Sequence, residues 1–446
     1  MVNPPSKLHA ILWSIPRVFL LLVLLVYVPL RAMAMSLALW VRGAELRRDP
    51  ADQHFDVVCF SHVPWNHIWQ RNHHTMTRLA KARKVLYLQL SGVSYVHVFA
   101  RRFPEDLPHW RARHESVVVR MPLLLPGESR FPIVQTMNSR ILAAYVKWQE
   151  WRLGMRNTVC WFYYPGNAGV TELLNPMAVV YDIQDEYTAF KWSPSDIAGR
   201  EASLLRKADL VFAGTHALYT AKTKDFAGGA HFYPCAVEFT HFHGAAPDSE
   251  AVLDEPPEIR NLPQPRLLYM GLIDGRIDED LLLSVAKQRP HWAIVLVGPV
   301  IAHEFDQDGR LAAQPNIHFT GQVDYKRLPQ FLAHASVYLM PWKVNELTKH
   351  INPTKTLEYL AAGRPVVSIA LPDLEEFFSA CVGLARSHDE FLSLCDQALS
   401  GAFVARIEEG MKTARAYAWE TVVQDMESHI ERAIELRRGT DKSRGA

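Results

Sequence analysis

Lys355 and Glu358 lie three residues apart, directly after Asn352, Pro353 and Thr354. That order predicts the start of a helix, because asparagine caps a helix through its side chain and proline fits the first helical position. The free N–H groups at such a terminus favour an anion. A lysine there adds a positive charge where a diphosphate would lie, and a glutamate one turn on can accept the hydroxyls of a ribose. The residues therefore favour a nucleotide, although a solvated Lys–Glu pair explains the spacing equally well.

The elements around this helix place it at the end of a strand. An apolar run over 337–340 precedes a polar loop, and a second apolar run follows Gly363 and Pro365, which end the helix. The predicted order is strand, loop, helix, strand. In an open parallel sheet, ligands bind beyond the carboxyl ends of the strands, so the pair would face a ligand crevice.

The same segment, 352–367, reads N-P-x-K-x-x-E-Y-x-A-x-G-x-P-V-V. It resembles the nucleotide-sugar segment of GT-B glycosyltransferases, near glycosyltransferase family four. The resemblance implies that Lys355 meets the donor diphosphate and Glu358 the ribose, with Asn352 and Thr354 in the same binding segment. The sequence departs from the pattern at His350, where the family often has a second glutamate that contacts the donor sugar.

A second stretch with the same resemblance is MGLIDGRIDEDLL. It is similar to the family's G-x-x-x-x-R-x-D turn beneath the diphosphate. The resemblance implies that Gly271 ends a strand and that Arg276 contacts phosphate oxygens. The alternative is that Arg276 is an ordinary surface arginine. Residues 278–280 read D-E-D, but acids are favoured at a helix start, so no metal site is expected. No cofactor is expected beyond the nucleotide-sugar co-substrate.

The first half of the chain offers an acid cluster at a predicted strand end, where QDEYTAF follows VVYDI: Asp182, Asp185 and Glu186. If the reaction inverts the anomeric centre, one carboxylate must take the acceptor's proton, and crowded carboxylates raise a pKa toward that work. Asp185 is the predicted catalytic base. The alternative is that these acids cap a helix or form surface pairs. His62, in the loop after the first strand, resembles the family's acceptor-side loop and is the second catalytic candidate; a structural histidine is the alternative.

Short apolar runs and helical segments alternate from Phe55 onward, which predicts an α/β fold with mostly parallel, doubly wound sheets. The resemblance implies GT-B, two Rossmann-like domains facing a cleft, preceded here by an amino-terminal membrane-associated apolar segment. The expected parts are a membrane-associated segment (1–50), an acceptor-side domain (51–243), a linker (244–264), a nucleotide-sugar domain (265–415), a helix crossing back (416–436) and a disordered tail (437–446).

Composition excludes several classes. With 48 basic against 47 acidic residues the formal net charge is +1, so bulk charge signals no nucleic-acid partner. The five cysteines are scattered and odd in number, which favours buried thiols over a disulfide framework. No G-x-G-x-x-G follows the first strand, which argues against a dinucleotide oxidoreductase.

Residues 11–41 are rich in large apolar side chains, with an uncharged run from Val18 to Leu30 that ends at Arg31. A spanning helix needs about 20 apolar residues, so this run spans only if Arg31 snorkels, and otherwise lies in the interface. A cleaved signal peptide is the competing interpretation. Because a nucleotide-sugar donor is cytosolic, we expect attachment to the inner membrane with the catalytic domains on its cytoplasmic face.

Together these patterns predict a metal-independent glycosyltransferase that moves a sugar from a nucleotide-sugar donor to a membrane-associated acceptor, either a lipid-linked saccharide or another saccharide. Polysaccharide or glycolipid assembly would be its role. The alternatives are a nucleotide-sugar epimerase on the same fold and a non-catalytic, membrane-held binding protein.

Overall fold

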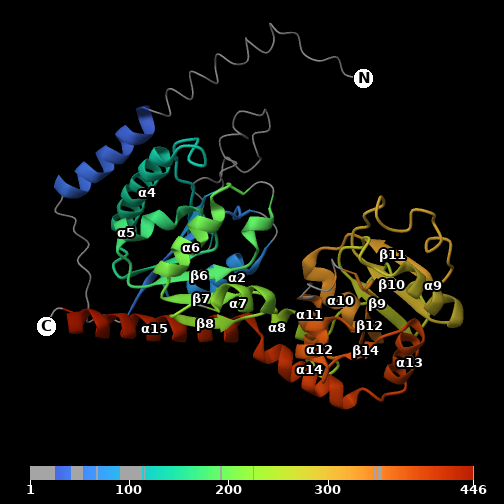
Figure 1. Cartoon of the computed structure of the whole chain (residues 1–446). Helices are drawn as coiled ribbons and strands as arrows, with labels where there is room; N and C mark the ends of the chain where they lie inside the picture. Colours follow the sequence, from blue (N-terminus) through green and yellow to red (C-terminus); the bar gives the residue numbers. More distant parts are fainter. Residues whose placement is uncertain are drawn as a thin grey trace, which may run out of the picture. The chain divides into compact units, whose positions relative to one another are not determined.

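The computed structural model describes residues 26–41, 54–66, 69–90, 113–114, 116–190, 193–224, 226–345, 348 and 354–444. The chain divides into two compact units (Figure 1). Unit 1 comprises Met1–Tyr233 and Val423–Ala446, and unit 2 comprises Pro234–Val422. Each unit is built on its own sheet with helices, which confirms the predicted pair of α/β domains.

The sheet of unit 1 has the strand order β3-β4-β2-β1-β5-β6-β7-β8, and every adjacent pair except β3 and β4 is parallel. Strand order reverses between β1 and β5, so the carboxyl ends of these two strands form the topological switch point where such sheets bind ligands. The strands are β1 (Asp56–Ser61), β2 (Val85–Gln89), β3 (Arg113–His114), β4 (Val117–Arg120), β5 (Thr158–Phe162), β6 (Val179–Ile183), β7 (Leu210–Ala213) and β8 (Gly229–Phe232).

Apolar runs explain why these strands are central: β1, β5, β6 and β7 are buried along their whole length, as strands covered on both faces must be. The longest helix described wholly within unit 1 is α4, which begins at Pro132 and ends at Gly154 in a left-handed cap. The helices of unit 1 are residues 26–41, α2 (Arg71–Leu79), α4 (Pro132–Leu153), η2 (Pro165–Val170), α5 (Thr171–Leu174), η3 (Tyr187–Ala189), α6 (Ile197–Lys207) and α7 (His216–Thr223).

The sheet of unit 2 is parallel, with the order β11-β10-β9-β12-β13-β14. This is the Rossmann order, and its switch point lies between the carboxyl ends of β9 and β12. The strands are β9 (Arg266–Met270), β10 (Ala293–Val297), β11 (Ile317–Gly321), β12 (Val337–Met340), β13 (Val366–Ile369) and β14 (Gly383–Ala385).

The helices of unit 2 pack on this sheet around one large apolar core. Asp278 caps α9 by accepting a hydrogen bond from the N–H of Leu281 at 3.0 Å, as expected for an acid at a helix start. The helices are α8 (Phe239–His243), α9 (Glu279–Gln288), η4 (Tyr325–Arg327), α10 (Leu328–Ala333), α11 (Thr354–Ala361), α12 (Pro372–Phe378), α13 (His388–Leu399) and α14 (Val404–Ala416).

Two of the expected parts, the linker and the tail, differ in detail from the sequence-based expectation. Residues 244–264 contain no helix or strand, as predicted for a linker, yet Ala245 and Ile259 are buried in the core of unit 2. Helix α15 (Trp419–Arg444) does return to unit 1, where Arg83 forms an ion pair with Glu427 at 2.6 Å. It continues through most of the tail predicted to be disordered.

Of the predicted membrane-associated segment, the structure describes residues 26–41, which are helical. Among all helices in the described parts of the chain, none combines the length and the apolar character needed to cross a bilayer.

Candidate functional site

Helix α11 and the end of β9 position Lys355. Gly271, the residue after β9, has a φ of 139°, and a Cβ atom there would stand 1.9 Å from Cε of Lys355. Gly298, the residue after β10, has a φ of 142°, and a Cβ atom there would stand 1.9 Å from the carbonyl oxygen of Gly271. Two glycines therefore let neighbouring strand ends and the lysine side chain approach at the switch point of unit 2. Gly298 was not predicted, although its position after AIVLV matches that of Gly271 after β9.

Lys355 and Glu358 are both half-buried. Burial, together with the charge of Arg276, lowers the pKa of Lys355, whereas burial raises the pKa of Glu358. The charges of Lys355 and Glu358 partly offset these shifts, because each favours the charged form of the other. Within the described part of the chain, neither side chain makes a hydrogen bond or an ion pair. Charged groups that are desolvated but unpaired are typical of a site that awaits a charged ligand.

Arg276 is held by Asp274, a residue that the sequence did not single out. Its Nε lies 2.8 Å from Oδ1 of Asp274 and its Nη2 lies 2.6 Å from Oδ2. Burial would raise the pKa of Asp274, but the hydrogen bonds and charge of Arg276 lower it. Nε and Nη2 of Arg276 are thus already bound, and Nη1 makes no hydrogen bond or ion pair within the described part of the chain.

The helix that carries the pair is anchored by Tyr359, whose hydroxyl accepts a hydrogen bond of 2.7 Å from the backbone N–H of Met270. Because Met270 is the last residue of β9, this bond ties α11 to the strand that ends at Gly271. Thr354 is the first residue of α11 and is exposed. Asn352, the predicted cap, lies outside the described residues.

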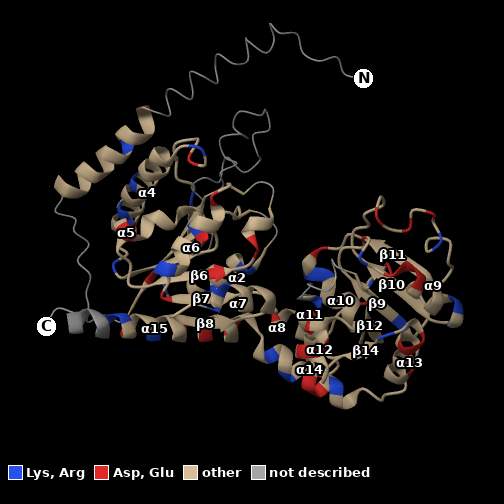
Figure 2. Ribbon diagram, in the orientation of Figure 1, with Lys and Arg blue, Asp and Glu red and all other residues tan. Residues whose placement is uncertain are grey.

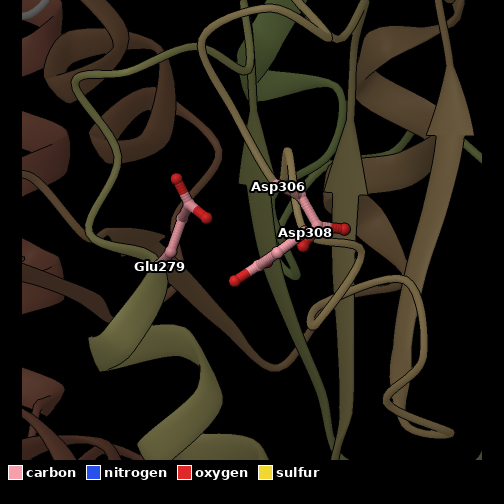
Figure 3. Close-up of side chains that lie close together, drawn as sticks. All are labelled: Glu279, Asp306 and Asp308. Atoms are coloured by element: carbon pink, nitrogen blue, oxygen red, sulfur yellow. The ribbon is translucent and has the colours of Figure 1, made fainter.

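Three carboxylates of unit 2 lie close together in another place (Figure 3). Glu279 projects from the beginning of α9, while Asp306 and Asp308 belong to one loop. Each has a partner in the protein: Asp306 accepts backbone N–H bonds of 2.8 and 2.9 Å, Asp308 binds Arg310 at 2.5 Å, and Glu279 lies 3.8 Å from Nζ of Lys343. The three carboxylates are thus partly occupied by contacts within the protein.

In unit 1 the three acids at the carboxyl end of β6 have different surroundings. Asp182 is fully buried and bonds to Arg71, with Oδ1 3.1 Å from Nη2. Glu186 accepts from Lys222 at 2.7 Å and also caps η3. Asp185 is half-buried and makes no hydrogen bond or ion pair among the described residues. Burial raises the pKa of Asp185. Of the three, Asp185 is therefore the acid available for chemistry.

His62 lies at the switch point of unit 1, directly after β1. Its ring centroid is 5.4 Å from that of Tyr164 and 5.5 Å from that of Tyr187, which follows the β6 acids. Burial lowers the pKa of His62 to about 4, so the imidazole is neutral near pH 7. Burial raises the pKa of Tyr187, and the charge of Asp185 raises it further, so Tyr187 is a neighbour of both predicted catalytic residues.

A pocket of about 580 Å³ lies in unit 1 among α4, η2, α5 and α6. Hydroxyl, amide and charged groups dominate its lining, and Gly166 and Arg200 are part of it. The ring of Tyr164 covers Gly166, because a Cβ atom on that glycine would stand 2.2 Å from Cε1. One tyrosine thus contacts both the pocket wall and His62. The lining residues are Gln135, Thr136, Ser139, Arg140, Gly166, Ala168, Gly169, Glu172, Leu173, Asp196, Gly199, Arg200 and Ser203.

Comparison with known proteins gives a family for the region that holds Lys355 and Glu358. Residues 276–428 match the family described as Glycosyl transferase-like. Unit 2 carries a glycosyl transferase-like domain. A Bacillus subtilis (strain 168) protein named as a teichuronic acid biosynthesis glycosyltransferase, TuaH, is 25% identical over 260 residues. The match covers 54% of this chain and 63% of TuaH, so the chain spans less than two thirds of that relative.

Solved structures show that the whole two-unit fold is shared. Sucrose-phosphate synthase from Thermosynechococcus elongatus superposes with a TM-score of 0.55 at 15% identity, covering 87% of this chain and 100% of that one. Anabaena Alr3699/HepE, in complex with UDP and glucose, gives 0.53 at 13% identity, covering 84% and 99%. The E. coli trehalose-6-phosphate structure bound with UDP-2-fluoro glucose gives 0.54 at 13%, covering 85% and 99%. The resemblance to GT-B glycosyltransferases is thereby confirmed.

Proposed function

We propose that this protein is a glycosyltransferase that moves a sugar from a nucleoside diphosphate to a saccharide acceptor in polysaccharide or glycolipid assembly. One observation carries the proposal: Lys355 and Glu358, half-buried and without protein partners among the described residues, stand at the switch point of a glycosyl transferase-like domain. A diphosphate supplies the anion that the lysine lacks, and a ribose supplies the hydroxyl donors that the glutamate lacks.

Uridine diphosphate sugars are the first donors to test. Two of the solved structures with this fold contain UDP or a UDP-sugar analogue, and one of them contains glucose. The contacts described above address the diphosphate and the ribose, so they support a nucleoside diphosphate sugar as a class.

In the proposed reaction, a hydroxyl oxygen of the acceptor forms a bond to the anomeric carbon of the donor sugar. The bond from that carbon to the diphosphate oxygen breaks, and its electron pair leaves with the diphosphate. Lys355 and Nη1 of Arg276 stabilise the charge that develops on the leaving group, in place of a metal ion. Asp185 takes the acceptor's proton, for which its raised pKa and its lack of a partner among the described residues suit it.

The acceptor would bind unit 1. The pocket of about 580 Å³ has the size of a small-molecule site, and hydrogen-bonding groups from three helices line it, as a saccharide requires. A lipid-linked saccharide at the cytoplasmic face of the inner membrane is the proposed acceptor, because residues 11–41 of the sequence are strongly apolar. TuaH is named for teichuronic acid biosynthesis, a polysaccharide pathway, which supports the same class.

The test combines binding with transfer. A thermal-shift panel of nucleoside diphosphates should raise the unfolding temperature for a diphosphate that occupies the site, because a ligand that binds only the folded chain stabilises it. Membranes incubated with labelled nucleotide-sugars should then yield label in extracted lipid or saccharide. Binding without transfer would show a non-catalytic protein, and free sugar or an altered donor would show an epimerase or hydrolase. A single displacement with Asp185 as the base gives a product with the inverted anomeric configuration.

A further inference from the structure

The helix of residues 26–41 exposes an unbroken stripe of large apolar side chains. Apart from two adjacent pairs, at its two ends, they recur at intervals of three or four residues, the spacing of one helix face, and they are between 50% and 79% exposed. Arg31, the charged residue of this helix, does not lie on the stripe: its guanidinium is 5.9 Å from the ring centroid of Tyr145 on α4. The stripe consists of Val26, Tyr27, Leu30, Met33, Leu37, Trp40 and Val41.

The opposite face fixes this helix to unit 1. Val28 is 2% exposed and forms a small apolar cluster with Leu125 and with Ile141 of α4, against which Ala32 also packs. The helix and α4 lie side by side, as Figure 1 also shows. The stripe therefore belongs to the surface of a folded domain.

Helix α4 continues this surface. Ile133 and Met137 are 71% and 38% exposed, and Arg140 and Lys147 are exposed further along the same stripe, at spacings of four, three and seven. The acid of α4, Glu150, is buried and accepts a hydrogen bond of 2.8 Å from Thr158. The exposed charges of α4 are therefore basic. Figure 2 colours the lysines and arginines along this helix blue. We name the stripe together with these four α4 residues the docking face.

We propose that unit 1 docks on an anionic lipid bilayer through the docking face, with the helix of residues 26–41 lying in the interface. Apolar residues on one face and basic residues beside them are what an interfacial helix needs, because the first enter the acyl boundary and the second meet anionic head groups. Tyr27 and Trp40, near the two ends of the stripe, belong to the residue types enriched at that depth. An anionic bilayer repels exposed acids, which fits the basic exposed charges of α4. A protein partner imposes no such requirement.

The docking face also borders the polar pocket, since Arg140 belongs to both and Thr136 of the same helix lines the pocket. A head group presented by the bilayer would thus reach the pocket mouth. This inference rests on the proposed function and deepens it, because it names the surface through which unit 1 meets a lipid-linked acceptor.

Nitroxide labels test the depth of the face in the full chain. Leu37→Cys and Met137→Cys would carry the label, with Val404→Cys at the exposed start of α14 in unit 2 as the control. Four natural cysteines are buried, and Cys235 would be replaced by serine. With phosphatidylcholine–phosphatidylglycerol vesicles, the labels at positions 37 and 137 should become accessible to oxygen and shielded from a water-soluble relaxing agent, while that at position 404 stays aqueous. Aqueous labels at position 137, or shielding without vesicles through dimerisation, would overturn the proposal.

Charge reversal gives the second readout. Arg140→Glu with Lys147→Glu should weaken binding to phosphatidylglycerol vesicles by on the order of tenfold or more and abolish its salt dependence. Lys287→Glu with Lys326→Glu, exposed in unit 2, makes the same charge change and should leave vesicle binding as it was. If the two double variants weakened vesicle binding equally, docking by this face would be refuted. The same conclusion would follow if neither variant changed vesicle binding. Nucleoside diphosphate affinity, a property of unit 2, should stay unchanged in all these variants. If the unaltered protein bound no nucleoside diphosphate, the proposed function would be refuted, whatever the result with vesicles.

Discussion

Lys355 lies across Gly271 so closely that a Cβ atom on the glycine would stand 1.9 Å from Cε of the lysine and 2.7 Å from its Nζ. Glycine is required at this strand end for two reasons, the backbone conformation and the space that the lysine occupies. The position of the ammonium group is thus fixed by the residue beneath it, and this gives the site a sharp test.

Replacing Gly271 by alanine should displace Lys355 and lower nucleoside diphosphate affinity by tenfold or more, about 1.4 kcal/mol or above. Isothermal titration would measure the affinity. Gly401→Ala is the matched control, because Gly401 also has a positive φ, 86°, yet nothing lies within 4 Å of its added Cβ. Gly401→Ala should lose about 1–2 kcal/mol of stability through backbone strain, and Gly271→Ala should lose more, because its φ of 139° lies outside the left-handed helical region and its Cβ also meets Lys355. Equal affinity in the two would show that Lys355 does not bind the diphosphate.

Glu358 should make nucleotide binding depend on pH. Its pKa is raised by burial, so the carboxylate that accepts ribose hydroxyls becomes protonated at a higher pH than an ordinary glutamate. As the pH falls from neutral toward that raised pKa, affinity for a ribonucleoside diphosphate should decrease. In Glu358→Gln this pH dependence should vanish, and the preference for ribose over 2′,3′-dideoxyribose should shrink. A preference that survives the substitution would assign the ribose to another residue.

Asp185→Asn should abolish turnover and leave nucleotide binding intact. Because burial raises the pKa of this carboxyl, its ionised form is disfavoured in the folded state at pH values above that pKa. The variant should therefore unfold at an equal or higher temperature than the parent at pH 7. Asp182→Asn is the contrast: it removes one partner of the buried Arg71 pair and should cost about 3–5 kcal/mol of stability. Full turnover in Asp185→Asn would exclude this residue as the base.

His62 should stay neutral throughout the working range. Burial lowers its pKa to about 4, so its imidazole resonances should titrate near that pH and show no inflection near 6.5. The loss of activity on acidification should then follow Asp185, whose pKa is raised above that of an ordinary aspartate. In a His62→Gln variant, activity should fall over the same acidic pH range as in the parent. If the substitution moves that pH range, His62 would be the titrating group.

The fold could be predicted because the buried strands are continuous apolar runs. The prediction for VVYDI, for example, matches the bounds of β6, and Gly363 with its φ of 67° follows the end of α11 as expected. Alternation of such strands with helices leaves few possible topologies. Sequence patterns did not reveal that residues 244–264 are packed, because irregular segments have no periodicity that would show which side chains are buried.

The site could be predicted where a motif is local and not where contacts are distant. Lys355, Glu358 and Gly271 were predicted from spacing and resemblance, and the structure brings Gly271 and Lys355 together. Arg71 binds Asp182 and Lys222 binds Glu186, and these contacts distinguish the two acids from Asp185. Both partners lie far from the acids in the sequence, so no local sequence pattern reveals them.

Chelation by EDTA should leave sugar transfer unchanged, since Lys355 and Arg276 are proposed to stabilise the leaving diphosphate. The carboxylates near α9 offer the alternative, and Glu279→Gln with Asp308→Asn tests them together. Each has a cation beside it, Lys343 at 3.8 Å and Arg310 at 2.5 Å, so the double variant should change stability by no more than about 1 kcal/mol. Transfer that stops in EDTA, recovers with added Mg²⁺ and fails in the double variant would replace the lysine-based mechanism with a metal-based one. If transfer stops in EDTA but the double variant remains active, the metal would have to bind at another site.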